Sequence, residues 1–460
     1  MKKQLNLFEN CEIKTYQKTE VCPLQYSRRK LSRSQRNQFS IQYKTLDDQI
    51  PINHEVRTVW AFVETLDLSL FEKRIVSLEG CVGRSSIDPK ILISLWIYAI
   101  ADGVITASKI AQYCKDNVAY SWICGSVSVK RHVLAKFRSQ NADLFESLIV
   151  QSVTALVDRN LVSLKEVSQD GVKIKASAAK QSMRRKKTLI GKALELKKHI
   201  NKLERQCQTH ALEKAVEKKK KREIEESKSK MKRIIQAANE INRHKKQLNE
   251  NRINNGKKKL SNKVVSEIRG STTDPECRKM RMSDHSVQCA YNFQIAVETD
   301  SELVLKTTPI QSSSDTGTMK PMFEDLKRKY PIKISRFLVD SAYIKLGDLN
   351  FLHDQNCLVY SPTSKSTALT IKKRVFSGKK NVSEGEKEFI FRMKTNESKQ
   401  IYNKRIRTSE TINAFIRNRR LYQFTVRGLQ KVKGFIDLIA LTYNMQVIKR
   451  MFPNFLTGTS

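Results

Sequence analysis

The sequence predicts an α/β protein, in which a mixed sheet is flanked by helices, with an all-α amino-terminal part and an inserted basic helical hairpin. Three observations lead to this prediction. Helical apolar spacing dominates residues 51–160. Short strand-like apolar runs follow and are separated by helical patterns, as in α/β folds. A lysine-rich stretch with a narrow apolar stripe separates the first strand-like segment from the others.

The charge of the chain points to a polyanionic partner. The 460 residues include 86 lysines and arginines against 46 acids, a formal net charge of +40. Like charges repel in a compact state, so folding alone does not require this excess, and DNA or RNA is the expected partner. A membrane surface is the weaker alternative, because the longest apolar run, Ile91–Ala101, is too short to span a bilayer. The first residues lack the apolar core of a signal peptide, so we expect a cytoplasmic protein that joins the nucleoid when bound to DNA.

The cysteines argue against a disulfide framework and against a zinc site. The chain has nine cysteines, an odd number, and none of them forms a Cys-x-x-Cys pair. The seven histidines show no ligand spacing with them. The cysteine and histidine spacing therefore argues against a zinc-dependent function.

The amino-terminal third divides into two expected regions. Residues 1–50 are polar and basic and are expected to form a flexible arm. Residues 51–160 are expected to be helical, as in "IDPKILISLWIYAIADG", which has a proline in its first turn and a closing glycine. Short helices joined by Gly and Asp turns are compatible with a helix-turn-helix that reads DNA and equally with a plain helical bundle.

The next segments predict the first strand and the insertion. "KEVSQDGVKIKASA" alternates apolar and polar residues around Asp170 and predicts a strand within 161–175. Residues 176–263 hold 28 lysines and arginines against 9 acids. Their apolar residues recur at helical spacing on a narrow stripe, which predicts a coiled-coil-like hairpin. A solvated charged face is the plain interpretation, and contact with nucleic-acid phosphates is the favoured one.

The remaining segments alternate between strand and helix. Strands are expected at Tyr291–Asp300 and Glu302–Gln311, joined as a hairpin, then at "ISRFLVD" and at "CLVYSP". Helices are expected at "TGTMKPMFEDLKRKY" and "LGDLNFLHDQ". A basic segment, 364–404, is expected to lead to a last helical region, which a tail at 452–460 follows.

Three acids stand out against this background. Asp170 and Asp340 lie at strand-like segments, and Glu410 follows Thr408 and Ser409 in the expected first turn of a helix. Each has an ordinary explanation as a turn or helix-end residue. Three carboxylates in one place would repel unless divalent cations neutralise them, and oxygen ligands suit Mg²⁺ or Mn²⁺, two ions in this arrangement. Asp315, in "SSSDTGTMK", is expected to cap a helix, with a position near this site as the alternative.

These motifs resemble a known family. "VSQDGVKIKASA", "FLVDSAY" and "YNKRIRTSETINAFIRNRR" resemble the three acidic motifs of bacterial insertion-sequence transposases of the DDE class, which have an RNase H-like catalytic core. The resemblance runs from about Ile52 to Met451 and fits the subgroup with a basic helical insertion between the first two acids. It implies a core made of residues 161–175 and 264–451.

The resemblance also implies roles for individual residues. Asp170, Asp340 and Glu410 would be the catalytic metal ligands. Tyr402, Arg405, Glu410 and Arg417 fall near the tyrosine-arginine-glutamate-lysine signature of the family, whose basic members hold DNA phosphates. Arg417 replaces the lysine, and the arginine-to-glutamate spacing is one residue longer than in the commonest form, so Arg407 is a second candidate for the role of Arg405.

The implied activity is metal-dependent cleavage at insertion-sequence ends followed by strand transfer. Its partners would be the terminal inverted repeats and target DNA, with a homodimer pairing two ends. Two other functions stay open at this point. One is a catalytically silent DNA-binding protein derived from a transposase. The other is a metal-dependent DNA nuclease without strand transfer.

Overall fold

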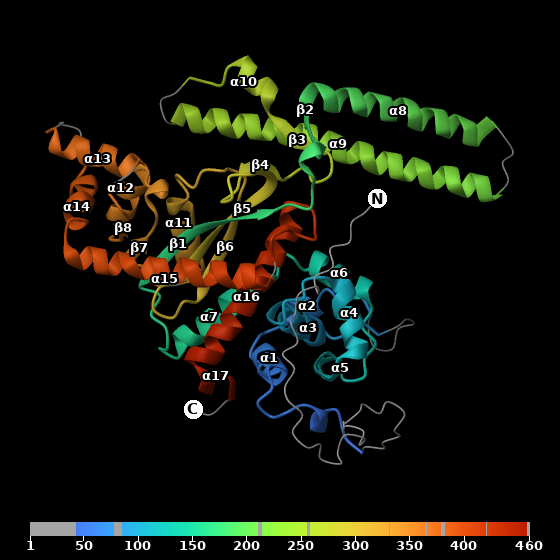
Figure 1. The fold of residues 1–460 in the computed structure, drawn as a ribbon, viewed down its shortest axis with the longest axis horizontal. Coiled ribbons are helices and arrows are strands. Elements are labelled where there is room, and N and C mark those ends of the chain that lie inside the picture. The colour runs from blue at the N-terminus through green and yellow to red at the C-terminus, as the bar shows by residue number, and fades with distance from the viewer. Residues whose placement is uncertain are drawn as a thin grey trace, which may run out of the picture. The chain divides into compact units, whose positions relative to one another are not determined.

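The computed structural model describes residues 43–77, 85–209, 214–254, 258–330, 332–363, 366–378, 382–419 and 421–457. Leu46–Ser460 form one compact unit (Figure 1). The expected basic arm, residues 1–50, lies outside the described residues except for 43–50, where a 3-10 turn, Asp47–Gln49, is present.

The described part of residues 51–160 contains seven helices, and one of them, α3 (Pro89–Ala101), packs against α1, α4 and α5. The helix α3 starts with Asp88 as its N-cap and Pro89 in its first turn. It is apolar on all sides, and Leu95, Trp96 and Ile97 are fully buried, as expected for a helix surrounded by others. The helices are α1 (Glu55–Glu64), α2 (Ser69–Glu72), α3 (Pro89–Ala101), α4 (Ala107–Asp116), α5 (Val118–Cys124), α6 (Arg131–Gln140) and α7 (Phe145–Asp158).

A six-stranded mixed sheet forms the centre of the rest of the chain. Its strands are β1 (Glu166–Lys175), β4 (Arg278–Arg281), β5 (Val287–Glu298), β6 (Val304–Ile310), β7 (Arg336–Leu338) and β8 (Leu358–Tyr360). The order is β4-β5-β1-β7-β8, and β6 also pairs with β5. The strand β5 is antiparallel to β1, β4 and β6, whereas β7 runs parallel to both β1 and β8. The predicted hairpin is present as β5 and β6.

The segment expected to be a basic connection is largely helical, which corrects the sequence prediction. It contains α13 (Ser366–Phe376), α14 (Glu384–Arg392) and the first part of α15 (Asn396–Asn418). The helix α15 begins at Asn396 because the Thr395 side chain accepts a hydrogen bond from the backbone N–H of Ser398. Glu410 therefore lies well inside a helix and not in its first turn. The remaining helices are α11 (Met319–Lys329), α12 (Leu346–Asp354), α16 (Leu429–Met451) and α17 (Pro453–Thr457).

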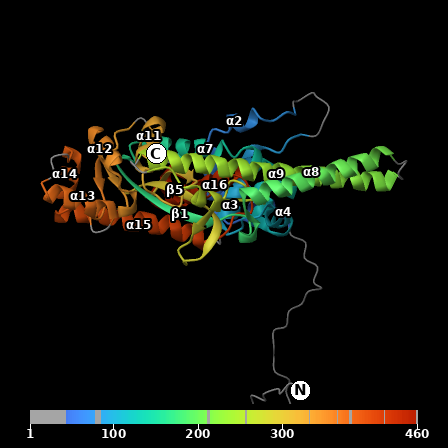
Figure 2. The same ribbon diagram turned by 90° about the horizontal axis from the view of Figure 1, so that it is seen from above.

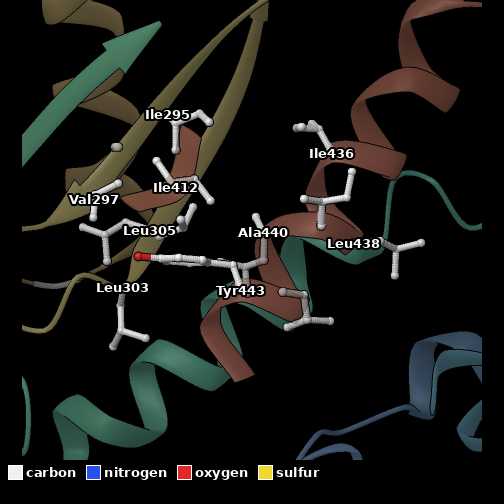
Figure 3. Packing of buried hydrophobic residues seen from close by; sticks show 14 of the residues in the cluster. Ile295, Val297, Leu303, Leu305, Ile412, Ile436, Leu438, Ala440 and Tyr443 are labelled. Atoms are coloured by element: carbon white, nitrogen blue, oxygen red, sulfur yellow. The ribbon is translucent and has the colours of Figure 1, made fainter. Parts of the chain in front are cut away.

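The two faces of β1 are covered by different helices. Ile412 of α15 packs with Ile295 and Val297 of β5, and Tyr443 of α16 belongs to the same cluster (Figure 3). On the other face, Gln169 donates a hydrogen bond to Thr318, the N-cap residue of α11. None of the helices in the described part of the chain combines the length and the hydropathy of a membrane span.

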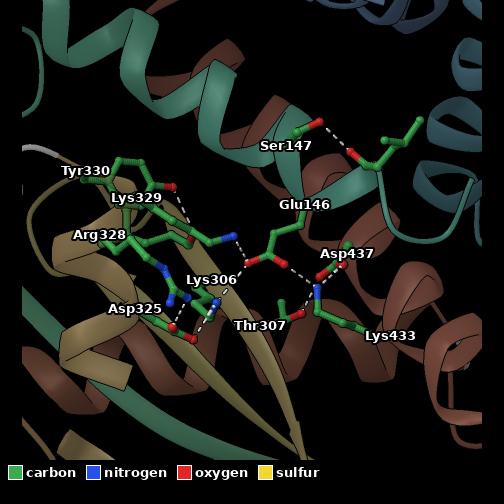
Figure 4. Close-up of polar contacts among 12 residues, drawn as sticks. Glu146, Ser147, Lys306, Thr307, Asp325, Arg328, Lys329, Tyr330, Lys433 and Asp437 are labelled. Atoms are coloured by element: carbon green, nitrogen blue, oxygen red, sulfur yellow. Dashed lines mark hydrogen bonds and ion pairs between the residues drawn. The ribbon is translucent and has the colours of Figure 1, made fainter. Parts of the chain in front are cut away.

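A buried ionic cluster joins α7, β6, α11 and α16 (Figure 4). The Glu146 carboxylate pairs with Lys306 at 3.0 Å, with Lys433 at 2.7 Å and with Lys329. Lys433 also pairs with Asp437, which is fully buried. Burial would raise the pKa of Glu146, but the three lysines together lower it to about 2.

The basic hairpin consists of two helices that lie side by side (Figures 1 and 2). They are α8 (Lys186–Thr209) and α9 (Lys214–Asn254). Apolar side chains form a narrow seam between them in two clusters, one around Leu189, Ile234, Ala237 and Ile241 and one around Ile200, Leu203 and Ile224. A two-stranded sheet of β2 (Met183–Arg185) and β3 (Arg269–Ser271) closes the base of the hairpin, and α10 (Asn262–Glu267) leads back toward the main sheet.

Candidate active site

Asp170 and Asp340 occupy equivalent positions on neighbouring strands. The strands β1 and β7 are parallel, with Ser168 opposite Leu338, and each aspartate comes two residues later. Asp170 lies within β1, whereas Asp340 follows the end of β7 and accepts a hydrogen bond from the backbone N–H of Ser341 at 2.7 Å. The two carboxylates are close enough that the charge of Asp340 raises the pKa of Asp170. The structure thus brings together the first two acids that the sequence singled out.

A single cation balances this pair. The Arg405 Nη2 atom of α15 lies 2.8 Å from Oδ1 of Asp170, and only 13% of the Arg405 side chain is exposed. Burial raises the pKa of Asp170, and the charge of Arg405 opposes this rise without cancelling it. The Nε atom of Arg405 is also buried without a hydrogen-bond partner in the described residues. Asp170 is therefore a carboxylate whose ionised form is incompletely compensated.

Two tyrosines flank the acid pair. Tyr402 lies one turn before Arg405 on α15 and is half-buried, and burial raises its pKa while Arg405 lowers it. Tyr343, in the turn after Asp340, is buried. Burial raises the pKa of Tyr343, and the charges of Asp315 and Asp170 add to the rise. The hydroxyl of Tyr343 has no hydrogen-bond partner among the described residues, so a polar atom without a partner lies beside the acids.

Asp315 does not cap a helix, which corrects the expectation from the sequence, and it faces Gly171 on the side of β1 opposite to the Asp170 side chain. Its Oδ1 accepts hydrogen bonds from the side-chain amides of Asn292 at 2.9 Å and Gln294 at 2.8 Å. A Cβ atom placed on Gly171 would lie 3.2 Å from this oxygen and 3.1 Å from the Tyr343 hydroxyl. Glycine after Asp170 therefore leaves room for the approach of Asp315 to the strand.

Glu410 lies apart from the two aspartates in this structure. Ser409, Ile412 and Asn413 are the α15 residues that line the small cavity beside Asp170. Glu410 is exposed and lines a groove between α15 and α16 together with Tyr443. Arg417 is also exposed.

The helical repeat explains this separation. Successive residues of an α-helix are turned by about 100°, so a residue four positions after Arg405 points about 40° away from it and one five positions after it about 140° away. Glu410 is five positions after Arg405. Arg417 follows Glu410 by seven positions and shares its side of the helix. The extra residue between Arg405 and Glu410 thus places Arg405 on one face of α15 and Glu410 and Arg417 on another.

Ion pairs join α15 to β1 and to the β5–β6 turn. Arg407 pairs with Glu302 at 2.7 Å, and Lys404 pairs with Asp300 at 2.9 Å and Glu166 at 3.2 Å. Arg407 is thus an exposed residue whose charge is already partnered within the chain. Together with Arg405, these contacts give α15 three cationic anchors on acidic partners.

The donor set fits a divalent cation only in part. Asp170 and Asp340 offer carboxylate oxygens, the ligands that Mg²⁺ and Mn²⁺ prefer. No group of three or more His, Cys, Asp or Glu side chains in the described part of the chain is arranged to hold a metal ion. The guanidinium of Arg405 contacts Oδ1 of Asp170, so Arg405 would compete with a cation for this oxygen.

Comparison with known protein families gives two matches. Residues 44–140 match the family described as a transposase domain (DUF772), and residues 268–445 match the family described as a transposase DDE domain. The chain belongs to the insertion-sequence transposases of the DDE class. No curated protein and no solved structure matches the chain.

Membership of this transposase family carries general consequences. The transposase domains indicate DNA transposition and hence a DNA substrate. The DDE domain implies an enzyme that transfers phosphoryl groups on DNA, and the family generally uses divalent metal ions. The second matched range includes Asp340, Tyr402, Arg405 and Glu410. Asp170 lies between the two matched ranges.

Sequence reasoning missed the amides that hold Asp315. Asn292 and Gln294 lie in "YNFQIAV", which was interpreted only as a strand, and both are buried on the same face of β5. Two buried amides spaced two residues apart in an apolar strand are a signal that could have been used, because buried polar side chains require partners. Their partner was not predictable, since Asp315 approaches from a loop that the pattern does not place.

Proposed function

We propose that this transposase catalyses metal-dependent cleavage at the ends of its insertion sequence and strand transfer into target DNA. The observation that carries the proposal is the register of β1 and β7, which sets Asp170 and Asp340 side by side, with Arg405 as the cation paired with Asp170. Incompletely neutralised carboxylates on neighbouring strands are suited to bind Mg²⁺ or Mn²⁺. We propose two such ions.

The core proposed for this chemistry is RNase H-like and consists of residues 161–175 and 264–451. The order β6-β5-β1-β7-β8 supports it, with an antiparallel β1–β5–β6 unit followed by two parallel strands. The proposed accessory parts are a helical region at 51–160, a basic insertion at 176–263 and a tail at 452–460. The position of the hairpin between β1 and β5 supports the assignment of residues 176–263 as an insertion into the core.

Each site residue has a proposed task. Asp170 and Asp340 would hold the ions, whose chemistry when bound is activation of a water or 3′-hydroxyl and stabilisation of the leaving oxygen. Arg405, released from Asp170, would contact a DNA phosphate together with Tyr402. Arg407 and Arg417 are the other proposed phosphate contacts. The protein thereby positions the reacting groups and balances charge, which is most of what phosphoryl transfer requires.

Glu410 is proposed as the third ligand in a rearranged form of α15. One extra residue is accommodated in an α-helix as a single-turn π-bulge, which turns the following residues by about 100°. A bulge between Arg405 and Glu410 would bring Glu410 to the side of Asp170. Glu410→Gln should then abolish cleavage while leaving the protein folded. Full cleavage activity of this variant would remove Glu410 from the metal site.

Two DNA ends have to be paired for concerted transposition, so we propose a homodimer on DNA. Its substrates would be the terminal inverted repeats and a target duplex.

A catalytically silent DNA-binding protein is the second candidate function, favoured by the one observation that Glu410 lies away from the two aspartates. A nuclease without strand transfer would share the same aspartates.

The experiment that tests the proposal is cleavage of DNA carrying the inverted repeats that flank the gene. The purified protein is incubated with this DNA and Mg²⁺, Mn²⁺ or chelator, beside Asp340→Asn and a matched variant of an exposed acid, Asp354→Asn. We expect metal-dependent nicking at the repeat end by the wild type and by Asp354→Asn, and no nicking by Asp340→Asn. Tight binding without cleavage under every condition would instead support the silent DNA-binding protein, and cleavage without joined products the nuclease.

A further inference from the structure

A basic groove lies at the side of the hairpin, near its base and outside the site described above. Its volume is about 520 Å³. Lys192 of α8 and Lys230 and Arg233 of α9 line it, and Thr272 and Thr273, which follow β3, close it on the side of the main sheet. Three cations and two hydroxyl-bearing residues thus line one concavity.

The cations of this groove lack the acidic partners that neutralise other parts of the hairpin. Glu204 pairs with Lys228, Glu217 with Lys221 and Glu226 with Arg222. Among the described residues, Lys192 and Lys230 form no ion pair, and Arg233 contacts only the hydroxyl of Ser229. One acid, Glu195, lines the groove, and His199 beside it pairs with Glu223. The groove therefore keeps an excess of positive charge.

The walls of the groove are firmly joined to the sheet. The backbone at Gly270 comes so close to α9 that a Cβ atom there would lie 2.7 Å from the carbonyl oxygen of Ala237. Arg278 of β4 pairs with Glu240 of α9 at 2.7 Å, and both side chains are nearly buried. On α8, Lys186 donates a hydrogen bond to Asn242 of α9 at 2.9 Å. Because these contacts fix both helices, a ligand in the groove would not have to order them.

We propose that this groove binds the sugar-phosphate backbone of duplex DNA, beside the segment engaged by the catalytic aspartates. The inference rests on the proposed function, because it takes the ends of the insertion sequence as the ligand. Unpartnered lysines, an arginine fork and hydroxyl groups are the side chains that contact phosphates, and such contacts position a duplex without reading its sequence. A hairpin of this charge then anchors the DNA while the chemistry takes place at the sheet.

The chain offers a matched control on the opposite side of the same helices. Lys197 comes five residues after Lys192, and Lys232 comes two residues after Lys230, so each points about 140° to 160° away from its counterpart. Both are exposed, and neither forms an ion pair among the described residues. The pair Lys197→Gln and Lys232→Gln thus removes the same charge as Lys192→Gln and Lys230→Gln without touching the groove.

The test is fluorescence anisotropy of a labelled duplex that carries one inverted-repeat end, measured over a range of salt concentrations. For Lys192→Gln/Lys230→Gln we expect about tenfold weaker binding near 0.15 M salt, and a log–log salt slope reduced by about 2, since each phosphate contact contributes about 0.9. Scrambling the repeat sequence should leave this difference unchanged. Lys197→Gln/Lys232→Gln should bind within about threefold of the wild type.

The outcomes separate this inference from the proposed function. Equal binding by the groove variant and the control variant would overturn the groove as a DNA site. If the wild type cleaves the same duplex with Mn²⁺ in that case, the proposed function stands and only the groove assignment fails. If the wild type neither binds nor cleaves the duplex, both fail.

Discussion

Asp170 and Glu146 are two largely buried carboxylates that the fold treats in opposite ways. Glu146 contacts three lysines, and although burial favours its neutral form, their charges lower its pKa to about 2. Asp170 contacts one arginine, lies near a second carboxylate, and has a raised pKa because burial outweighs Arg405. A carboxylate whose charge is fully neutralised by lysines joins structural elements. A carboxylate whose charge is only partly neutralised can still bind a further cation. The contrast distinguishes an acid that joins structural elements from the acid proposed to be catalytic.

The largest expected effect comes from removing the charge of Asp170. Asp170→Asn should lower DNA cleavage by at least about a thousandfold, because the metal ions would lose a ligand charge. Asparagine keeps an oxygen that accepts a hydrogen bond from Arg405, so the free energy of unfolding should fall by only about 1–2 kcal/mol. Glu146→Gln should instead lower the free energy of unfolding strongly and retain DNA cleavage at low temperature. A cleavage assay and urea unfolding on both variants check the pair, and a Glu146→Gln protein that folds fully but does not cleave would contradict the contrast.

The next effect concerns the ionic cluster of α7, β6 and α16. Lys433→Met would leave the fully buried Asp437 without its counter-charge, and breaking a buried ion pair on one side costs about 3–5 kcal/mol. Lys431→Met, at an exposed position of the same helix, should change the free energy of unfolding by less than about 0.5 kcal/mol. Urea unfolding monitored by circular dichroism compares the two variants. Similar midpoints for both would show that the cluster contributes little.

The pH dependence of stability provides a smaller and independent measure. The pKa of Glu146 in the folded protein, about 2, is below its ordinary value. The ionised carboxylate therefore stabilises the fold above pH 4.5, and this contribution is lost as the pH falls from about 4.5 toward 2. Allowing for solvent screening, its size is about 2 kcal/mol. Between pH 5 and pH 3 the wild type should lose stability more steeply than Glu146→Gln, and parallel curves would count against this assignment.

The sequence alone predicts only part of the difference between Asp170 and Glu146. The strands around Asp170 and Asp340 were predictable from their apolar patterns, and acids on adjacent parallel strands come together through local register. The Glu146 cluster was not predictable, because its partners, Lys306, Lys329 and Lys433, are distant in the sequence and meet only through packing. The early start of α15 was missed because its first turns are polar. Because α15 is already helical at Arg405, the helical repeat counted from Arg405 determines which face of α15 carries Glu410.

The affinity for Mn²⁺ measures the proposed metal site of Asp170 and Asp340 without DNA. Titration of the protein with Mn²⁺, followed by electron paramagnetic resonance, compares the wild type with Asp340→Asn and Glu146→Gln. We expect the wild type and Glu146→Gln to bind Mn²⁺ with the same affinity and Asp340→Asn to bind at least tenfold more weakly. Unchanged Mn²⁺ binding by Asp340→Asn would contradict the assignment of the paired aspartates as the metal site.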